Sequence, residues 1–397
     1  MKVVCPICFS KIDVSSDIGY RCKNSRCNPA KGKTDYFRKS IPFLEMLGLK
    51  DQPWSIPHTW DEGACGEEAC DRVCNKCKQE IPPDTFRLSS PKIAIIGSKE
   101  SGKSHYIATL VEWIKHAAGE FGWSFNWADD ESANSFMNDF YKPLYEEKVP
   151  IISTRAVTNG MAKPLSAYLT FGVGKFQKVI MLVFFDAAGE NLEGDTTQIS
   201  RYICNASGII CLLDPLQLPS IRKSIIAEGR TENTLPEKNG ITGDVIGKVA
   251  RLIRKNNRLG TARIKIPLAV ALSKMDYIRD VLNDSRKYPD EVMISNALFN
   301  NDSHHNGCFD ETKFGELHEL MRRWVDKVDE SEDIDRNLVS AFKSSGYFGF
   351  SALGCNPRGN LDDNGNDVLQ HEPQPCRVED PFLWILWKLG LIRSRKD

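Results

Sequence analysis

One glycine-rich segment limits the fold of this chain more than any other feature. Residues 97–104 read GSKESGKS, which fits the pattern G-x-x-x-x-G-K-[ST]. Four apolar residues, 93–96, precede the segment, and helical spacing follows it from Lys103 to Ala118. A strand, a glycine turn and a helix N-terminus in this order let successive backbone N–H groups surround phosphate oxygens. The sequence therefore predicts a phosphate-binding loop rather than an accidental glycine turn before a surface helix. Its contacting residues would be Gly97, Ser98, Lys99, Glu100, Ser101, Gly102, Lys103 and Ser104.

The chain after this loop alternates short apolar stretches with helical segments. Strands are predicted at residues 165–171, 179–185, 209–213, 267–272 and 347–351. This alternation predicts a three-layer α/β fold with a mainly parallel sheet over residues 89–397, preceded by a small cysteine-rich module over residues 1–88. Insertions are expected near residues 119–163 and 219–262. The first should be folded, because Phe136, Phe140 and Leu144 recur every four residues, and the second is the better candidate for a mobile loop.

Two further motifs follow predicted strands. An aspartate, Asp186, and a glycine, Gly189, form DAAG after residues 179–185, at the strand end where α/β sheets bind ligands. Asp186 and Ser104 could hold Mg²⁺, and the Gly189 N–H could sense a terminal phosphate. The alternative is a purely structural role, in which Asp186 only caps a turn.

The motif SKMD follows residues 267–272. The Asp276 carboxylate could accept from N1–H and the 2-amino group of guanine, which adenine lacks, while the Lys274 stem lies over the base. Later in the chain, Ser351 and Ala352 follow another strand, and the Ala352 N–H could reach guanine O6. The alternative is that Lys274 and Asp276 lie in a solvated loop and bind no ligand.

These motifs occur in the order found in P-loop GTPases, which the chain resembles over about residues 91–397. The cysteine-rich N-terminus leading into CNKCKQEIP and IAIIGSKESGKS more narrowly resembles the bacterial double-GTPase type, whose members are conflict-system GTPases. The resemblance implies GTP and GDP as ligands, Mg²⁺ as cofactor, and regulatory or effector proteins as partners. Lys103 would then reach the β- and γ-phosphates.

The sequence departs from the GTPase pattern at one base-binding residue, where purine selectivity could be softer, and at one hydrolytic residue. Ser273 stands where Asn or Thr is usual, and Glu190 stands where many GTPases have the water-positioning Gln. An ionised Glu cannot donate a hydrogen bond, so we expect slow hydrolysis by the isolated protein. Thr154 is slightly favoured over Thr158 as the switch threonine, and Arg155 could be an arginine finger, although an exposed loop arginine is the simpler interpretation.

Cysteines dominate the N-terminal module. The chain has 13, and eight lie in the first 77 residues: Cys5, Cys8, Cys22, Cys27, Cys65, Cys70, Cys74 and Cys77. Close pairs in a cytosolic chain are typical of metal ligands, which predicts about two Zn²⁺ ions. The spacing suits one site from the first four and another from the last four, and it leaves a crossed or nested arrangement open.

Charge and hydropathy narrow the function classes. Net charge is -1, and no apolar run approaches the ~18 residues that span a bilayer, so we expect a cytoplasmic protein. Residues 1–50 carry ten Lys and Arg against four acidic residues, a surface that could touch nucleic acid. A structural or protein-docking zinc ribbon is favoured over that use. The alternative functions are a zinc-ribbon binding module carrying a slow nucleotide-binding domain, and an ATPase, which Asp276 opposes.

Overall fold

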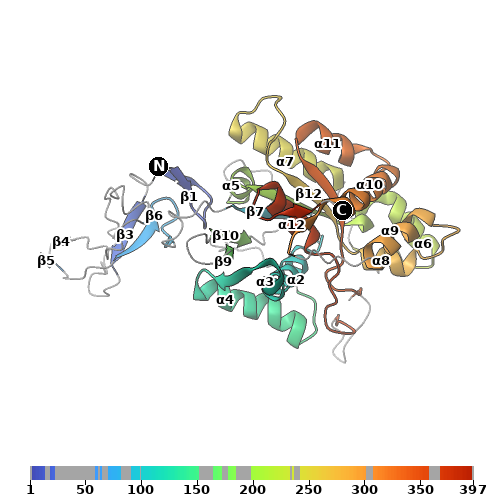
Figure 1. The fold of residues 1–397 in the computed structure, drawn as a ribbon, viewed down its shortest axis with the longest axis horizontal. Helices are drawn as coiled ribbons and strands as arrows, with labels where there is room; N and C mark the ends of the chain where they lie inside the picture. The colour runs from blue at the N-terminus through green and yellow to red at the C-terminus, as the bar shows by residue number, and fades with distance from the viewer. Residues whose placement is uncertain are drawn as a thin grey trace. The chain divides into compact units, whose positions relative to one another are not determined.

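The computed structural model divides the chain into two compact units. One comprises Met1–Pro91 with Val179–Met181, and the other comprises Lys92–Lys178 with Leu182–Asp397 (Figure 1). The structure describes residues 2–13, 18–22, 59–60, 63–64, 70–81, 91–98, 100–151, 164–171, 178–184, 198–232, 235–236, 242–300, 307–356 and 367–395.

The first unit consists of short antiparallel strand pairs. Strand β1 (Lys2–Val4) pairs with β2 (Lys11–Asp13), β3 (Ile18–Cys22) with β6 (Cys70–Cys74), and β4 (Thr59–Trp60) with β5 (Gly63–Ala64). Within residues 2–81 of this unit, the described apolar core is small and comprises Ile7, Phe9, Ile12, Val73 and Ile81. A core of this size provides little hydrophobic stabilisation without additional cross-links.

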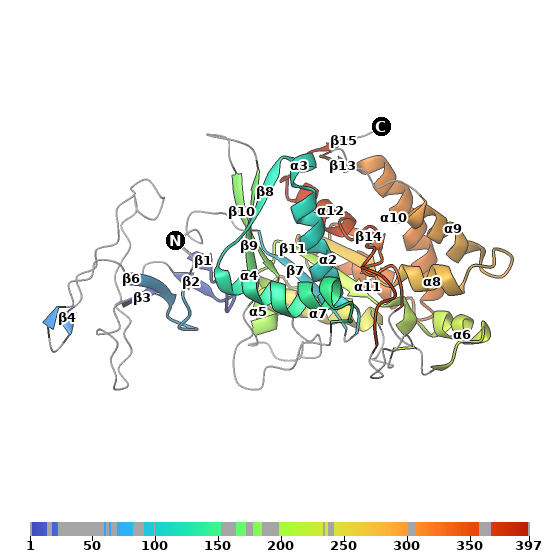
Figure 2. The ribbon, with the colours of Figure 1, turned by 90° about the horizontal axis from the view of Figure 1, so that it is seen from below.

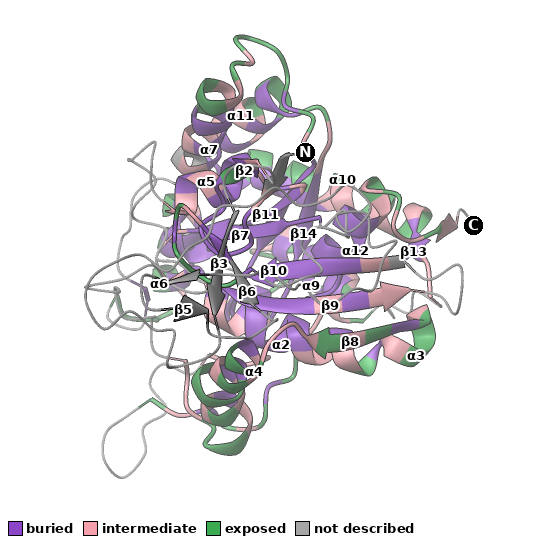
Figure 3. Ribbon diagram, turned by 90° about the vertical axis from the view of Figure 1, so that its left-hand side faces the viewer, coloured by how far each residue is buried: buried purple, intermediate pink, exposed green. Residues whose placement is uncertain are grey.

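A four-stranded parallel sheet forms the centre of the second unit. Its strands are β7 (Ile93–Gly97), β11 (Gly208–Leu213), β12 (Leu268–Leu272) and β14 (Ser345–Gly349), in the order β14-β12-β11-β7. Their continuous apolar sequences suit a sheet covered on both faces, and Figure 3 shows β7, β11 and β14 coloured as buried. The mainly parallel α/β fold predicted from the sequence is confirmed.

A second, three-stranded sheet lies in the order β10-β9-β8. Its strands are β8 (Trp123–Trp127), β9 (Leu165–Phe171) and β10 (Lys178–Phe184), and β8 runs antiparallel to β9. Tyr202, on α5 (Gln198–Cys204), connects this sheet to β7. Its hydroxyl accepts from the Ile95 N–H at 3.3 Å and lies 2.6 Å from the Ile93 carbonyl and 3.2 Å from the Val183 carbonyl.

Helices cover the central sheet. Helix α2 (Lys103–His116) contacts β7, and α12 (Asp380–Lys388) contacts β11, β12 and β14. Two groups of packed helices complete the unit (Figure 2). In one group α7 packs against α5 and α11, and in the other α9 packs against α8 and α10. The remaining elements are α3 (Ala118–Phe121), α4 (Asp130–Phe136), η3 (Met137–Glu146), η6 (Pro215–Gln217), α6 (Pro219–Ala227), α7 (Thr242–Asn257), α8 (Met275–Val281), α9 (Pro289–Phe299), β13 (Phe309–Asp310), α10 (Glu311–Val328), α11 (Asp333–Ala341) and β15 (Ser394–Arg395).

The two predicted insertions differ from expectation in detail. The first is folded as predicted, and Phe136, Phe140 and Leu144 are buried, but the helix from Met137 is a π-helix. A period of four residues fits the wider π turn as well as the α turn. The second insertion was expected to begin as a loop, yet it begins with α6, which has Pro219 at its first position. Among the helices that the structure describes, none has the length and apolar character needed to cross a bilayer.

Candidate nucleotide site and cysteine centre

The phosphate loop lies between β7 and α2, as predicted. Gly102 has a φ of 86° and caps α2, a left-handed conformation that favours glycine. Lys103 is buried, and its ammonium donates to the carbonyls of Gly97 at 3.2 Å and Ser98 at 2.8 Å. The loop thus holds the Lys103 ammonium inside the curve of the backbone, where phosphate oxygens would be bound.

Two close approaches shape this loop. A Cβ on Gly97 would lie 2.5 Å from the Ser101 Oγ and 2.7 Å from the Leu212 carbonyl oxygen, so only glycine fits there. The Ser101 hydroxyl is fully buried and has no hydrogen-bond partner among the described residues. A buried orphan hydroxyl, an enclosed ammonium and the amino end of a 14-residue helix together form a cradle suited to an anion.

The base motifs meet at the carboxyl ends of β12 and β14. The Met275 N–H donates to the Phe350 carbonyl at 3.2 Å, which ties the two loops together. Asp276 is 4% exposed. Burial raises the pKa of Asp276, and the nearby Ser351 side chain opposes that rise. The structure therefore brings Asp276 and Ser351 together, with the partly exposed Ala352 directly after them.

Sequence reasoning missed one residue of this cluster, Asp214. It follows β11, is fully buried, and its Oδ2 lies 2.7 Å from the Lys274 Nζ. The same signal that pointed to Asp186, an aspartate at the carboxyl end of a buried strand, could have identified it. Lys274 itself has a φ of 56°, in the left-handed region, and caps α8. Ser273 is also buried, and its hydroxyl donates to the Leu213 carbonyl at 3.3 Å.

A second missed residue is His105, which follows Ser104 in the first turn of α2. Its Nε2 accepts from the Ile151 N–H at 3.1 Å. Burial, helped by the positive charge of Lys274, lowers the pKa of His105 to about 4, so the ring is neutral near pH 7. A neutral Nε2 with a free lone pair is required for this bond. Its only sequence signal is its place beside Ser104.

Several predicted site residues lie outside the described part of the chain. They are Lys99, Thr154, Arg155, Thr158, Asp186, Gly189 and Glu190. The strand that precedes Asp186 is present as β10.

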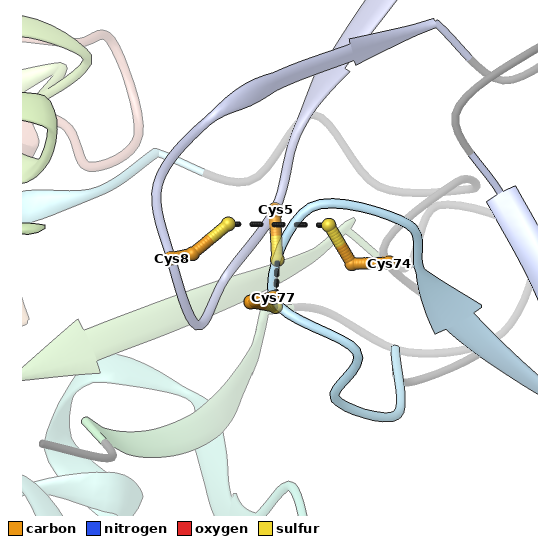
Figure 4. Close-up of side chains that lie close together, drawn as sticks. All are labelled: Cys5, Cys8, Cys74 and Cys77. Carbon is orange, nitrogen blue, oxygen red and sulfur yellow. Dashed lines mark hydrogen bonds between the residues drawn. The ribbon is translucent and has the colours of Figure 1, made fainter. Parts of the chain in front are cut away.

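Four cysteines converge in the first unit. The sulfur atoms of Cys5, Cys8, Cys74 and Cys77 all lie within 4.8 Å of one another, and the residues are buried (Figure 4). The pairs Cys5–Cys77 and Cys8–Cys74 have sulfur separations of 3.9 Å. Tetrahedral zinc with Zn–S bonds of about 2.3 Å requires sulfur separations of about 3.8 Å, so this donor set fits zinc.

The two halves of the centre have the same local geometry. The Cys5 N–H donates to the Ser10 carbonyl at 3.0 Å, and the Cys74 N–H donates to the Gln79 carbonyl at 2.9 Å. The residue after each second cysteine is left-handed, Phe9 at 56° and Lys78 at 61°. Two C-x₂-C turns therefore fold alike and face one another, as ligand-bearing turns around one ion do.

The described cysteines favour the nested arrangement that the spacing left open. The first and last pairs gather in one cluster, instead of Cys5 and Cys8 with Cys22 and Cys27. Cys22 and Cys70 are register partners in the β3–β6 ladder. Cys27 and Cys65 lie outside the described residues. Spacing predicts the two turns but not which turns face each other.

One family model and one curated relative match this sequence. The model of the family described as Double-GTPase 2 matches residues 92–325. SaeC of Mycolicibacterium smegmatis, whose assigned name proposes an ESX-1 scaffolding and assembly role, is 26% identical over 332 residues, covering 81% of this chain and 80% of SaeC.

Among solved structures, a signal recognition particle receptor SRb-GTP/SRX complex from Chaetomium thermophilum matches with 14% identity and a TM-score of 0.28, over 68% of this chain and 94% of that chain. The Arl6 BBS3 small GTPase from Trypanosoma brucei matches with 12% identity and a TM-score of 0.25, over 76% of this chain and 98% of that chain. The family model spans more than half of the sequence and includes the phosphate loop and the base motif SKMD. The chain belongs to the Double-GTPase 2 family.

Proposed function

We propose that this protein is a magnesium-dependent GTP-binding and hydrolysing switch whose turnover is slow without a partner. One observation carries the proposal: the Lys103 loop and the Asp276–Ser351 pair lie at the carboxyl ends of strands in one parallel sheet. Nucleotides bind at this edge of open α/β sheets, with phosphates at the glycine loop and the base further along.

The chemistry of Asp276 supports guanine as the base. An ionised carboxylate accepts two hydrogen bonds, and guanine offers two donors, N1–H and the 2-amino group. Adenine instead presents its N1 acceptor, which would repel the carboxylate and leave it buried without a partner. Since Asp276 is 4% exposed, an unmatched base would incur most of the desolvation penalty.

The phosphate-binding end of the proposed site needs a metal ion to neutralise the charge that develops on the phosphoryl group during hydrolysis. Ser104 and Asp186 would hold Mg²⁺, Thr154 and Gly189 would respond to the terminal phosphate, and Mg²⁺ would supply charge stabilisation. Because Glu190 replaces the usual glutamine, orientation of the attacking water must come from Glu190 itself, from a residue such as Arg155, or from another protein.

Protein partners suit a switch of this kind. The similarity to SaeC supports an assembly or scaffolding role in a bacterial system, and the resemblance to conflict-system GTPases supports a defence role. In both cases the nucleotide state would change the affinity for a partner protein.

Zinc binding is the second part of the proposal. Cys5, Cys8, Cys74 and Cys77 would hold one ion, which would act as a structural cross-link for a unit with few buried apolar residues. The inner four cysteines (Cys22, Cys27, Cys65 and Cys70) would hold the second.

Multiple-turnover hydrolysis of GTP and ATP, with and without Mg²⁺, tests the enzymatic part. We expect magnesium-dependent GTP turnover below about 1 s⁻¹, the low end for typical enzymes, and no ATP turnover. Glu190→Ala and Arg155→Ala distinguish the source of the residual rate. Rapid hydrolysis that neither substitution diminishes would contradict the proposal.

A further inference from the structure

Asp214 and Lys274 form a partly buried ion pair that the GTPase motifs do not require. Strands β11 and β12 are parallel, with Leu213 opposite Leu272, so the loops that follow start side by side. The Asp214 side chain is 0% exposed and that of Lys274 is 31% exposed, and their charged atoms are 2.7 Å apart. The other carboxylate oxygen, Oδ1, accepts from the Leu216 N–H at 2.9 Å. Both oxygens of Asp214 are therefore fixed.

The direction of the lysine side chain is also defined. Its ammonium is anchored on the Asp214 carboxylate at the end of β11, the strand that pairs with β7 just before the phosphate loop. Two positions after Lys274, Asp276 contacts Ser351 on the other side of the base motif. The aliphatic stem of Lys274 thus runs between its own backbone and a fixed anchor, beside the place where the base would lie.

We infer that Asp214 is a positioning residue for nucleotide binding, which holds the Lys274 stem as a preformed surface for the base. The inference rests on the proposed function. A free lysine has four rotatable bonds whose freedom is lost when a ligand immobilises it, and a partly buried ion pair removes that freedom before binding. Through the Lys274 stem, Asp214 acts on the face of the base and not on its edge. It therefore sets the affinity without discriminating between purines that differ only in their edge groups.

A double-mutant cycle in the full-length protein tests this role. The variants are Asp214→Asn, Lys274→Met and the two combined, with dissociation constants measured for GDP and inosine diphosphate. Asn keeps the size of the side chain and an acceptor for the Leu216 N–H, and Met keeps an apolar stem without the charge. Asp214→Asn should weaken GDP and inosine diphosphate binding by the same factor, about 10- to 100-fold, the value of one hydrogen bond to a charged group.

The combined variant should bind no more than about twofold more weakly than Lys274→Met alone, because Asp214 acts only through Lys274. It also removes both charges together, so, unlike Lys274→Met, it leaves no unpaired carboxylate in a fully buried position. Glu228→Gln is the matched control, since it breaks an exposed ion pair with Lys287 at 3.0 Å and should leave both affinities unchanged.

Three results would overturn the inference. They are unchanged affinity in Asp214→Asn, a loss that adds to that of Lys274→Met, and a change in the ratio of GDP to inosine diphosphate affinity. The failure of the proposed function is distinguishable, because the wild-type protein would then bind neither diphosphate.

Discussion

Two fully buried tyrosines should respond in opposite ways to the same substitution. The Tyr202 hydroxyl contacts the Ile95 N–H at 3.3 Å and the Ile93 and Val183 carbonyls at 2.6 Å and 3.2 Å. The Tyr106 hydroxyl is buried as deeply but has no hydrogen-bond partner among the described residues. Removing one oxygen atom from each therefore isolates the hydrogen-bonding contribution.

Tyr202→Phe leaves backbone groups of β7 and β10 without their partner, in a site that water does not reach. The expected loss is about 1–3 kcal/mol of unfolding free energy. For a unit of this size, ~1 kcal/mol shifts Tm by about 2 °C, so Tm should fall by about 2–6 °C. Tyr106→Phe removes an unsatisfied hydroxyl and should be neutral or stabilising by about 1 kcal/mol.

Differential scanning calorimetry of the two variants and the wild type provides the measurement. The comparison is well controlled, because both substitutions delete the same atom from equally buried rings. Equal Tm shifts in the two variants, or an unchanged Tm in Tyr202→Phe, would refute the assignment of Tyr202 as the bridge between β7 and β10.

Three further predictions concern metal, base and pH. Elemental analysis should find about two zinc ions per chain, and Cys8→Ser should lower that number by about one; a value near zero under reducing conditions would reject the centre. Asp276→Asn should reduce the preference for GTP and admit xanthosine nucleotides, as measured by competition binding; equal wild-type affinities for GTP and ATP would contradict it. Protonation of His105 breaks its bond from Ile151, and its folded pKa is about 4 against an ordinary 6.5. Its stabilising contribution is complete above about pH 6.5 and falls as the pH drops toward about 4. Denaturant unfolding at several pH values should therefore show that His105→Gln loses less unfolding free energy across this window than the wild type. The same dependence of unfolding free energy on pH in both proteins would count against the bond.

Local sequence signals predicted the phosphate loop and the strands well. Glycines at 97 and 102, an apolar run before them and helical spacing after them are all short-range features. Gly102 takes the left-handed conformation that favours glycine, and Gly97 has no room for a Cβ. The position of Asp276 was equally readable, because it follows the buried strand β12.

Long-range partners could not be derived in the same way. The ion pair between Asp214 and Lys274 joins residues 60 positions apart and depends on the β11–β12 register. The nested cysteine centre joins turns about 70 positions apart, and C-x₂-C spacing is satisfied by either pairing. Helix α6 was missed because Ser220, Arg222 and Lys223 gave its sequence a polar character, although Pro219 marked its start.

Guanine nucleotide binding through Lys103 tests the central claim most directly. Isothermal titration of the wild-type protein with GTP and ATP, in the presence of Mg²⁺, should show binding of GTP and at most weak binding of ATP. Lys103→Ala removes the ammonium that the Gly97 and Ser98 carbonyls hold inside the loop, and GTP binding should be lost. Unchanged GTP affinity in Lys103→Ala, in protein that still unfolds cooperatively at the wild-type temperature, would contradict the account of this site.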